Sequence, residues 1–200
     1  MKQVLFIHGW NLIKDNDELL KTMATREVNP FEEKKRRRMT LQEQLPEFKV
    51  IKPEMPNKDM ARYSAWKLWF EKYLPFLDSE KLIAIGHSLG AMFLIKYLWE
   101  NQFPLSISQL HLVAPALDQQ GLNEGDNYLW DFAYDLSIVK NLEKRTNQIF
   151  LRHSKDDPCV PFSHSEKIKA ELPSAKFIIF EDRQHINQPK FPELIEEIRK

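Results

Sequence analysis

The stretch Lys81-Leu-Ile-Ala-Ile-Gly-His-Ser-Leu-Gly-Ala-Met-Phe-Leu-Ile-Lys-Tyr-Leu-Trp99 decides the fold of this 200-residue chain. An apolar run ends at Ile85, the pentapeptide Gly86-His-Ser-Leu-Gly90 follows, and a helical pattern continues from there. A buried strand, G-x-S-x-G and a helix together are the context of a nucleophile elbow, with Ser88 on a sharp turn. Only small residues fit beside so tight a turn, hence the two glycines. The turn points the serine hydroxyl at a helix start, where backbone N–H groups can hold an oxyanion, a geometry that serves acyl transfer.

Six short apolar runs along the chain predict β-strands. Most lack polar alternation, which is typical of strands that are covered on both faces in a parallel sheet. Helical patterns lie between them, so we expect right-handed crossovers and a doubly wound, mainly parallel six-stranded α/β sheet with helices on both faces. The predicted strands are Gln3–His8, Lys49–Ile51, Lys81–Ile85, Gln109–Val113, Gln148–Arg152 and Lys176–Phe180.

Start and stop signals place three further helices. Asp59 precedes a helical pattern over Met60–Leu74, whose aromatic residues recur three or four apart and indicate a core-facing side. The capping box Ser163-His-Ser-Glu166 predicts a helix that ends near Pro173. Pro192 suits the first turn of a helix that runs to the C-terminus.

Length and composition favour a single domain over residues 1–200. Lys plus Arg and Asp plus Glu both number 29, so the chain lacks the basic surplus that nucleic-acid binding needs. The apolar run at the N-terminus is too short for a signal peptide or a membrane span, so no membrane partner is expected. The single cysteine, Cys159, cannot form an internal disulfide, which favours a cytoplasmic location.

Residues 14–48 are the least regular connection. Asn29-Pro30 predicts the start of a helix over Phe31–Arg38, and Thr40-Leu-Gln-Glu43 resembles another capping box. The segment leaves the C-terminal end of the first strand, the edge where open α/β sheets bind ligands, so we expect it to cover part of the active site. The basic run Lys34–Arg38 reads as a solvated helix face rather than a nucleic-acid patch, because Glu32 and Glu33 can pair with it. The segment 14–48 could also bind a protein partner, and the sequence leaves this alternative open.

A serine needs a base within hydrogen-bond reach and an acid that holds the base in the right tautomer. In this kind of fold the chain order is serine, then aspartate or glutamate, then histidine. The turn after the fifth strand contains Asp156 and Asp157, and both are candidates for the acid. His185 follows the sixth strand and is placed to reach the same edge of the sheet.

At these positions the chain resembles the α/β-hydrolase superfamily, and within it the small retinoblastoma-binding-protein-9-like serine hydrolases. The residues that carry the resemblance are Val4-Leu-Phe-Ile-His-Gly9, the Gly86–Gly90 elbow, Asp157-Pro-Cys-Val-Pro161 and His185. The spacing Asp-x-x-Val-Pro favours Asp157 over Asp156 as the acid. Residues 14–48 fall outside the resemblance.

The resemblance implies a compact α/β-hydrolase fold with strand order 2-1-3-4-5-6. By it, Ser88 is the nucleophile, Asp157 the orienting acid and His185 the general base. The backbone N–H groups of Leu89 and Trp10 would form the oxyanion hole. The bulky Trp10 ring is expected to narrow the pocket.

The other aromatic, histidine and cysteine residues could serve the site or simply pack in the fold. Trp130, in the acidic-aromatic stretch before the fifth strand, is the leading candidate to line the acyl or leaving-group pocket beside Trp10, although packing explains it equally well. No histidine has metal-ligand spacing with other ligands, so neither a metal nor another cofactor is expected. We expect His8 to support the oxyanion loop, His87 to be the variable residue of the elbow, His111 to be a core or edge residue, His153 and His164 to lie on the surface, and Cys159 to be a small buried hydrophobe.

The sequence therefore predicts a serine hydrolase that cleaves a small ester, thioester or amide through an acyl-enzyme. Two alternatives use the same fold. One is a protein-interaction module with vestigial catalysis, since fold does not fix function. The other is an acyltransferase that uses the same triad.

Overall fold

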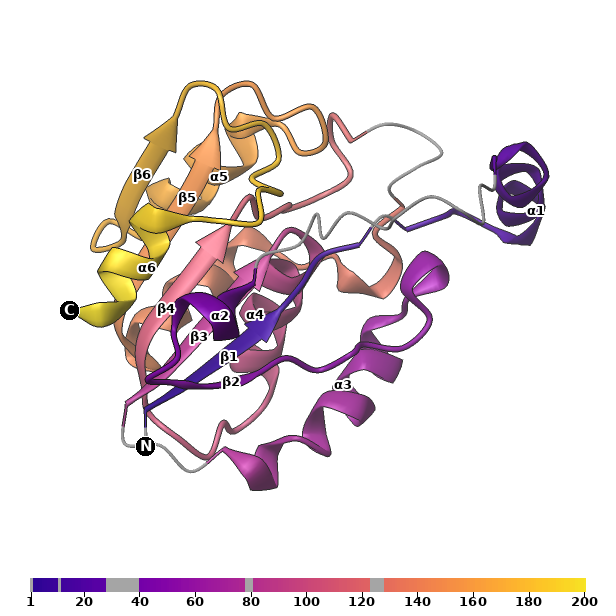
Figure 1. The fold of residues 1–200 in the computed structure, drawn as a ribbon. Coiled ribbons are helices and arrows are strands. Elements are labelled where there is room, and N and C mark those ends of the chain that lie inside the picture. Colours follow the sequence, from indigo (N-terminus) through magenta and orange to yellow (C-terminus); the bar gives the residue numbers. More distant parts are fainter. Residues whose placement is uncertain (1, 11, 28–39, 78–80, 123–127) are drawn as a thin grey trace.

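A computed structural model of the chain describes residues 2–10, 12–27, 40–77, 81–122 and 128–200. Six parallel strands form one sheet in the order β2-β1-β3-β4-β5-β6 (Figure 1). All six predicted strands are confirmed, and the order is the one that the resemblance implies. The strands are β1 (Gln3–Ile7), β2 (Lys49–Ile51), β3 (Leu82–His87), β4 (Ile107–Val113), β5 (Thr146–Ser154) and β6 (Lys176–Phe180).

Helices cover both faces of the sheet because successive strand side chains enter two separate cores. On β3, Leu82 and Ala84 pack with α3, α4 and α5, whereas Ile83 and Ile85 pack with α2 and α6. No helix in the described ranges is both long and apolar enough to cross a membrane. The α-helices are α1 (Asn16–Thr25), α2 (Leu41–Gln44), α3 (Tyr63–Glu71), α4 (Leu89–Glu100), α5 (Phe162–Glu171) and α6 (Pro192–Arg199), and the 3-10 helices are η1 (Lys58–Met60), η2 (Leu74–Phe76), η3 (Trp130–Phe132) and η4 (Leu136–Lys144).

The start of α3 differs from the prediction, which placed a cap at Asp59. The helix begins at Tyr63, and the carboxylate of Asp131 accepts hydrogen bonds from the backbone N–H groups of Tyr63 at 2.7 Å and Ser64 at 3.1 Å. Asp59 lies in η1 instead. The cap thus comes from η3, 68 positions further along the chain, which explains why a local pattern did not find it.

Neither predicted capping box forms its side-chain bond. Helix α5 begins at Phe162, after Pro161, and the hydroxyl of Ser165 lies inside the helix against a buried imidazole. Helix α2 begins where expected, but Thr40 makes no side-chain cap bond. Helix α6 does begin at Pro192, as predicted.

The described part of 14–48 contains α1 and α2. Helix α1 has no buried residue, and Figure 1 shows it projecting away from the sheet. Helix α2 packs into the core of the α6 face through Leu41 and Leu45. The predicted helix over Phe31–Arg38 and the basic run Lys34–Arg38 lie outside the described residues, so a covering role for this segment stays a prediction.

A buried polar row runs between the sheet and α6. The Arg152 guanidinium donates to Nδ1 of His111 at 2.6 Å, and His111 lies 2.9 Å from the side-chain oxygen of Gln109. Burial lowers the pKa of His111 well below its usual value and lowers the pKa of Arg152 to about 10. His111 is therefore a neutral core residue, as the sequence predicted.

Candidate active site

Ser88 lies on the turn that joins β3 to α4. Its backbone has a φ of 53° and a ψ of −122°, a conformation that costs a non-glycine residue about 1–3 kcal/mol. The Ser88 N–H donates to the carbonyl of Val113 on β4 at 2.8 Å, which fixes the turn to the neighbouring strand. The side chain is only half-buried and lines a pocket, so its hydroxyl is presented at the carboxyl edge of the sheet.

The two glycines of the elbow permit this turn because α4 passes directly over β1 and β3. A Cβ on Gly90 would lie 2.1 Å from the carbonyl oxygen of Ile7, and one on Gly86 would lie 2.5 Å from Cα of Ala91. Both contacts are with backbone and cannot be relieved by turning a side chain. The sequence interpretation of these glycines is thus confirmed in physical terms.

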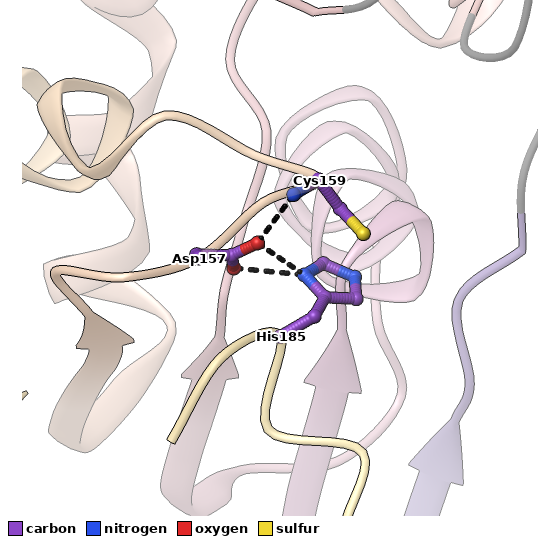
Figure 2. A group of neighbouring side chains, drawn as sticks. All are labelled: Asp157, Cys159 and His185. Carbon is purple, nitrogen blue, oxygen red and sulfur yellow. Dashed lines mark hydrogen bonds and ion pairs between the residues drawn. The ribbon is translucent and has the colours of Figure 1, made fainter. Parts of the chain in front are cut away.

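His185 and Asp157 meet at the same edge of the sheet (Figure 2). Nδ1 of His185 lies 2.8 Å from Oδ2 and 3.1 Å from Oδ1 of the Asp157 carboxylate. Because a carboxylate only accepts, Nδ1 carries the proton and Nε2 is left with its lone pair. The Asp157 carboxylate is fully buried, and its Oδ1 also accepts from the backbone N–H groups of Cys159 at 2.8 Å and Val160 at 3.0 Å.

A second imidazole holds the same carboxylate. His153 is completely buried, and its Nε2 lies 3.1 Å from Oδ2 of Asp157 and 3.1 Å from the carbonyl oxygen of Val160. Two acceptors at Nε2 require the proton there, so Nδ1 accepts from the Ser165 hydroxyl at 2.7 Å. Burial alone would raise the pKa of Asp157, but the bonds from His153 and His185 lower it well below its usual value.

His153 was expected on the surface, and that prediction is wrong. The last residues of β5 remain buried under α5, whereas sequence alone suggested an exposed strand end. His164 was also expected on the surface and is buried on α5: its Nδ1 accepts from the Leu117 N–H at 3.1 Å, and its Nε2 donates to the Gln120 carbonyl at 2.7 Å.

Asp156, the competing candidate for the acid, has a different set of contacts. Its Oδ1 accepts from the Ser154 hydroxyl at 2.5 Å and from the Gln184 backbone N–H at 2.8 Å. These bonds tie the turn after β5 to the loop after β6 that carries His185. The geometry therefore pairs His185 with Asp157, and Asp156 braces the loop.

His87, the variable residue of the elbow, contacts His185. Its Nε2 donates to the backbone carbonyl of His185 at 2.8 Å, and the two rings meet edge to face with centroids 4.9 Å apart. Burial and the neighbouring His185 lower the pKa of His87 to about 3, so it is neutral at ordinary pH. The sequence assigned no role to His87, because this contact joins residues 98 positions apart.

A small, mainly apolar pocket opens beside Ser88, with about 280 Å³ of space when the open solvent at its mouth is included. Trp10 lines it, as the sequence predicted, and Leu89 lines it as well. Trp130 is not among the described residues that line this pocket: its ring packs under the Arg62 guanidinium at 3.6 Å, and its Nε1 donates to the carbonyl of Ile13. The lining residues are Trp10, Leu12, Ser88, Leu89, Met92, Ala116, Leu122, Leu129 and Val160.

Comparison with known proteins identifies the family. A family model described as serine hydrolase matches residues 38–193. The chain belongs to this family. Serine hydrolase RBBP9 from Rattus norvegicus is 30% identical over 162 residues, which cover 78% of the chain and 80% of that protein. The protein is therefore a serine hydrolase and an enzyme.

Solved structures place this serine hydrolase in the α/β-hydrolase fold. The ydeN gene product from B. subtilis aligns over 100% of the chain and 97% of its own, with a TM-score of 0.67 and 18% identity. A meta-cleavage product hydrolase from Pseudomonas fluorescens aligns over 100% of the chain and 88% of its own, with a TM-score of 0.67 and 15% identity. At these identities the likeness establishes the fold.

Proposed function

We propose that this serine hydrolase cleaves small acyl esters, thioesters or amides through Ser88, His185 and Asp157. The observation that carries the proposal is the bond from His185 Nδ1 to the buried Asp157 carboxylate at 2.8 Å. That bond fixes the tautomer in which Nε2 can accept a proton. Ser88 supplies a hydroxyl at the same sheet edge, on a turn held by neighbouring strands.

In the first step, the Ser88 hydroxyl oxygen attacks the substrate carbonyl carbon while Nε2 of His185 takes its proton. The carbonyl oxygen becomes an oxyanion, for which the N–H groups of Leu89 and Trp10 are the proposed donors. The N–H of Ser88 itself already donates to Val113, whereas Leu89 opens α4, where first-turn N–H groups lack helical partners.

In the second step, the protonated His185 gives its proton to the leaving group, and the acyl–Ser88 ester remains. Water then attacks that ester while His185 accepts its proton, the bond from the acyl carbon to the Ser88 oxygen breaks, and His185 returns the proton to that oxygen as the acid product leaves. The Asp157 carboxylate stays ionised throughout and stabilises the imidazolium that forms twice in the cycle. This role fits its lowered pKa.

The pocket beside Ser88 supports a short acyl chain. The pocket is small, and the side chains of Trp10, Met92 and Leu129 narrow it. Its walls are mainly apolar, which favours an uncharged aliphatic group. We therefore expect acetyl to butyryl esters to outperform long-chain esters.

The test is a kinetic panel of p-nitrophenyl esters of increasing chain length. Ser88→Ala and His185→Ala should each lower kcat by about 10⁴-fold or more with the fold intact by circular dichroism. Asp157→Asn should also reduce kcat strongly, and Asp156→Asn is the matched control, with a much smaller loss. Unchanged turnover in Ser88→Ala would refute the proposal, and product analysis with added alcohol or amine separates hydrolysis from acyl transfer.

A further inference from the structure

Three side chains with different metal-binding atoms meet at the carboxyl edge of the sheet. The thiol of Cys159, a ring nitrogen of His185 and a carboxylate oxygen of Asp157 all lie within 4.8 Å of one another (Figure 2). The sequence showed no metal pattern because His185 comes from the loop after β6, and the other two come from the turn after β5. Cys159 is half-buried.

The set of donor atoms is one that suits a borderline-soft cation. Zn²⁺ binds thiolate sulfur at about 2.3 Å and imidazole nitrogen at about 2.0–2.1 Å, so its ligands lie within roughly 4 Å of one another. The ligand atoms, which lie within 4.8 Å of one another, must therefore move slightly closer when an ion binds. Water can fill the other positions, as at open zinc sites.

The orientation of His185 also matches that of a metal ligand. Metal-binding histidines commonly donate their other ring N–H to a carboxylate, which fixes the ring and raises its basicity. Nδ1 of His185 already donates to Asp157, and Figure 2 shows the Cys159 sulfur over the part of the ring that faces away from that carboxylate. Nε2 is therefore the nitrogen that would meet the ion.

We propose that Cys159 and His185, with Asp157 behind the ring, form a binding site for a thiophilic divalent cation such as Zn²⁺, and that the ion inhibits the enzyme. On binding, the Cys159 thiol loses its proton to solvent, and neutral His185 gives its lone pair to the ion. Nε2 can then no longer take the proton of Ser88. The inhibition rests on the proposed function, whereas the binding does not.

Binding is tested without any activity measurement, by titrating the purified protein with Co²⁺ and recording its absorption spectrum. Cys159 is the only cysteine in the sequence, so a thiolate-to-cobalt charge-transfer band reports this site alone. The band should appear in wild type, disappear in Cys159→Ser and weaken in His185→Ala. His164→Ala, which removes a buried histidine that lies 3.6 Å from the Asp118 carboxylate, should leave the band unchanged. No band in wild type, or an equal band in His185→Ala, would overturn the site.

Inhibition is tested with Zn²⁺ in the ester assay. Cys159→Ser should keep the metal-free turnover, because the thiol takes no part in the proposed steps, and should need about 10-fold more Zn²⁺ for half-inhibition. Equal Zn²⁺ sensitivity in the two proteins would overturn the inhibitory role. If the wild type shows no ester turnover, the proposed function fails, and the cobalt band still decides whether the site binds metal.

Discussion

Nε2 of His153 lies 3.1 Å from Oδ2 of Asp157, the carboxylate oxygen that Nδ1 of His185 also approaches to 2.8 Å. One buried carboxylate is thus held between two imidazoles that have opposite tautomers. His153 donates from Nε2 and is itself fixed by Ser165, whereas His185 donates from Nδ1. We infer that His153 positions the carboxylate and takes no proton in the reaction.

Replacing His153 should therefore affect turnover more than substrate binding. His153→Ala leaves Asp157 short of a buried donor, which should lower kcat with KM nearly unchanged and reduce the free energy of unfolding by about 1–3 kcal/mol. Steady-state kinetics and denaturant titration measure both. His153→Gln, which can still donate, should recover part of kcat. A variant that lost stability alone, with normal kcat, would show that His153 has no positioning role.

The Trp10 side chain should limit the length of the acyl chain. Trp10→Ala enlarges the pocket while it keeps the backbone N–H, so kcat/KM should shift toward longer esters by about 4-fold per added methylene, the equivalent of about 0.8 kcal/mol. The indole also donates to Asp59 at 3.0 Å, so Trp10→Phe is the control that removes this bond but keeps most of the bulk. An unchanged chain-length profile in Trp10→Ala would place the acyl group elsewhere.

Burial of His87 should make folding weaker in acid. The pKa of His87 is about 3 in the folded chain, against 6.5 for a free histidine. Between pH 3 and pH 6.5, His87 therefore binds a proton in the unfolded chain but stays neutral in the folded chain. The free energy of unfolding therefore keeps its full value above pH 6.5 and falls as the pH drops toward 3. The expected loss between pH 7 and pH 5 is about 2 kcal/mol.

His87→Gln tests this assignment because glutamine keeps an N–H donor but does not titrate. Guanidinium titrations at pH 7 and pH 5 should show a smaller loss of unfolding free energy in the variant than in wild type. If the free energy of unfolding fell equally with pH in both proteins, His87 would be able to bind a proton in the folded state.

Gly90 should tolerate no side chain. Gly90→Ala places a methyl group 2.1 Å from the Ile7 carbonyl oxygen, so α4 must move away from β1. We expect a loss of at least about 1–3 kcal/mol of unfolding free energy, together with reduced turnover, because the same shift displaces Ser88. A thermal melt checks the stability. A variant with wild-type melting temperature and activity would contradict the close packing of the elbow.

The sequence predicted the six strands because strands depend on local apolar runs, whereas their order in the sheet was implied by the resemblance to the α/β-hydrolases. Because parallel strands end together at one sheet edge, the sequence brought Ser88 and His185 there with either Asp156 or Asp157, and the spacing of the family favoured Asp157. The sequence did not identify His87 and His153 as contacts of the site. Each forms its hydrogen bonds with residues that fold against it, and no local sequence pattern indicates such bonds. The cap of α3 by Asp131 was missed for the same reason.

The positions of Cys159 and Trp130 could not be predicted from the sequence either, because both depend on how irregular segments fold against one another. The sequence treated Cys159 as a packing residue, and only the folded loops bring its thiol within 4.8 Å of His185. It offered Trp130 as a pocket residue, yet the neighbouring Leu129 lines the pocket, and the Trp130 ring stacks with Arg62. In an irregular segment no periodicity tells which of two adjacent side chains points inward.

The proposed function requires Ser88 to be an activated nucleophile. Reaction of the purified protein with a fluorophosphonate, followed by mass spectrometry of the peptides, tests this requirement. We predict one stable adduct on Ser88 in wild type, no adduct in Ser88→Ala and strongly slowed labelling in His185→Ala. Failure of the folded, metal-free wild type to react, or an adduct on another residue that persists in Ser88→Ala, would contradict the claim.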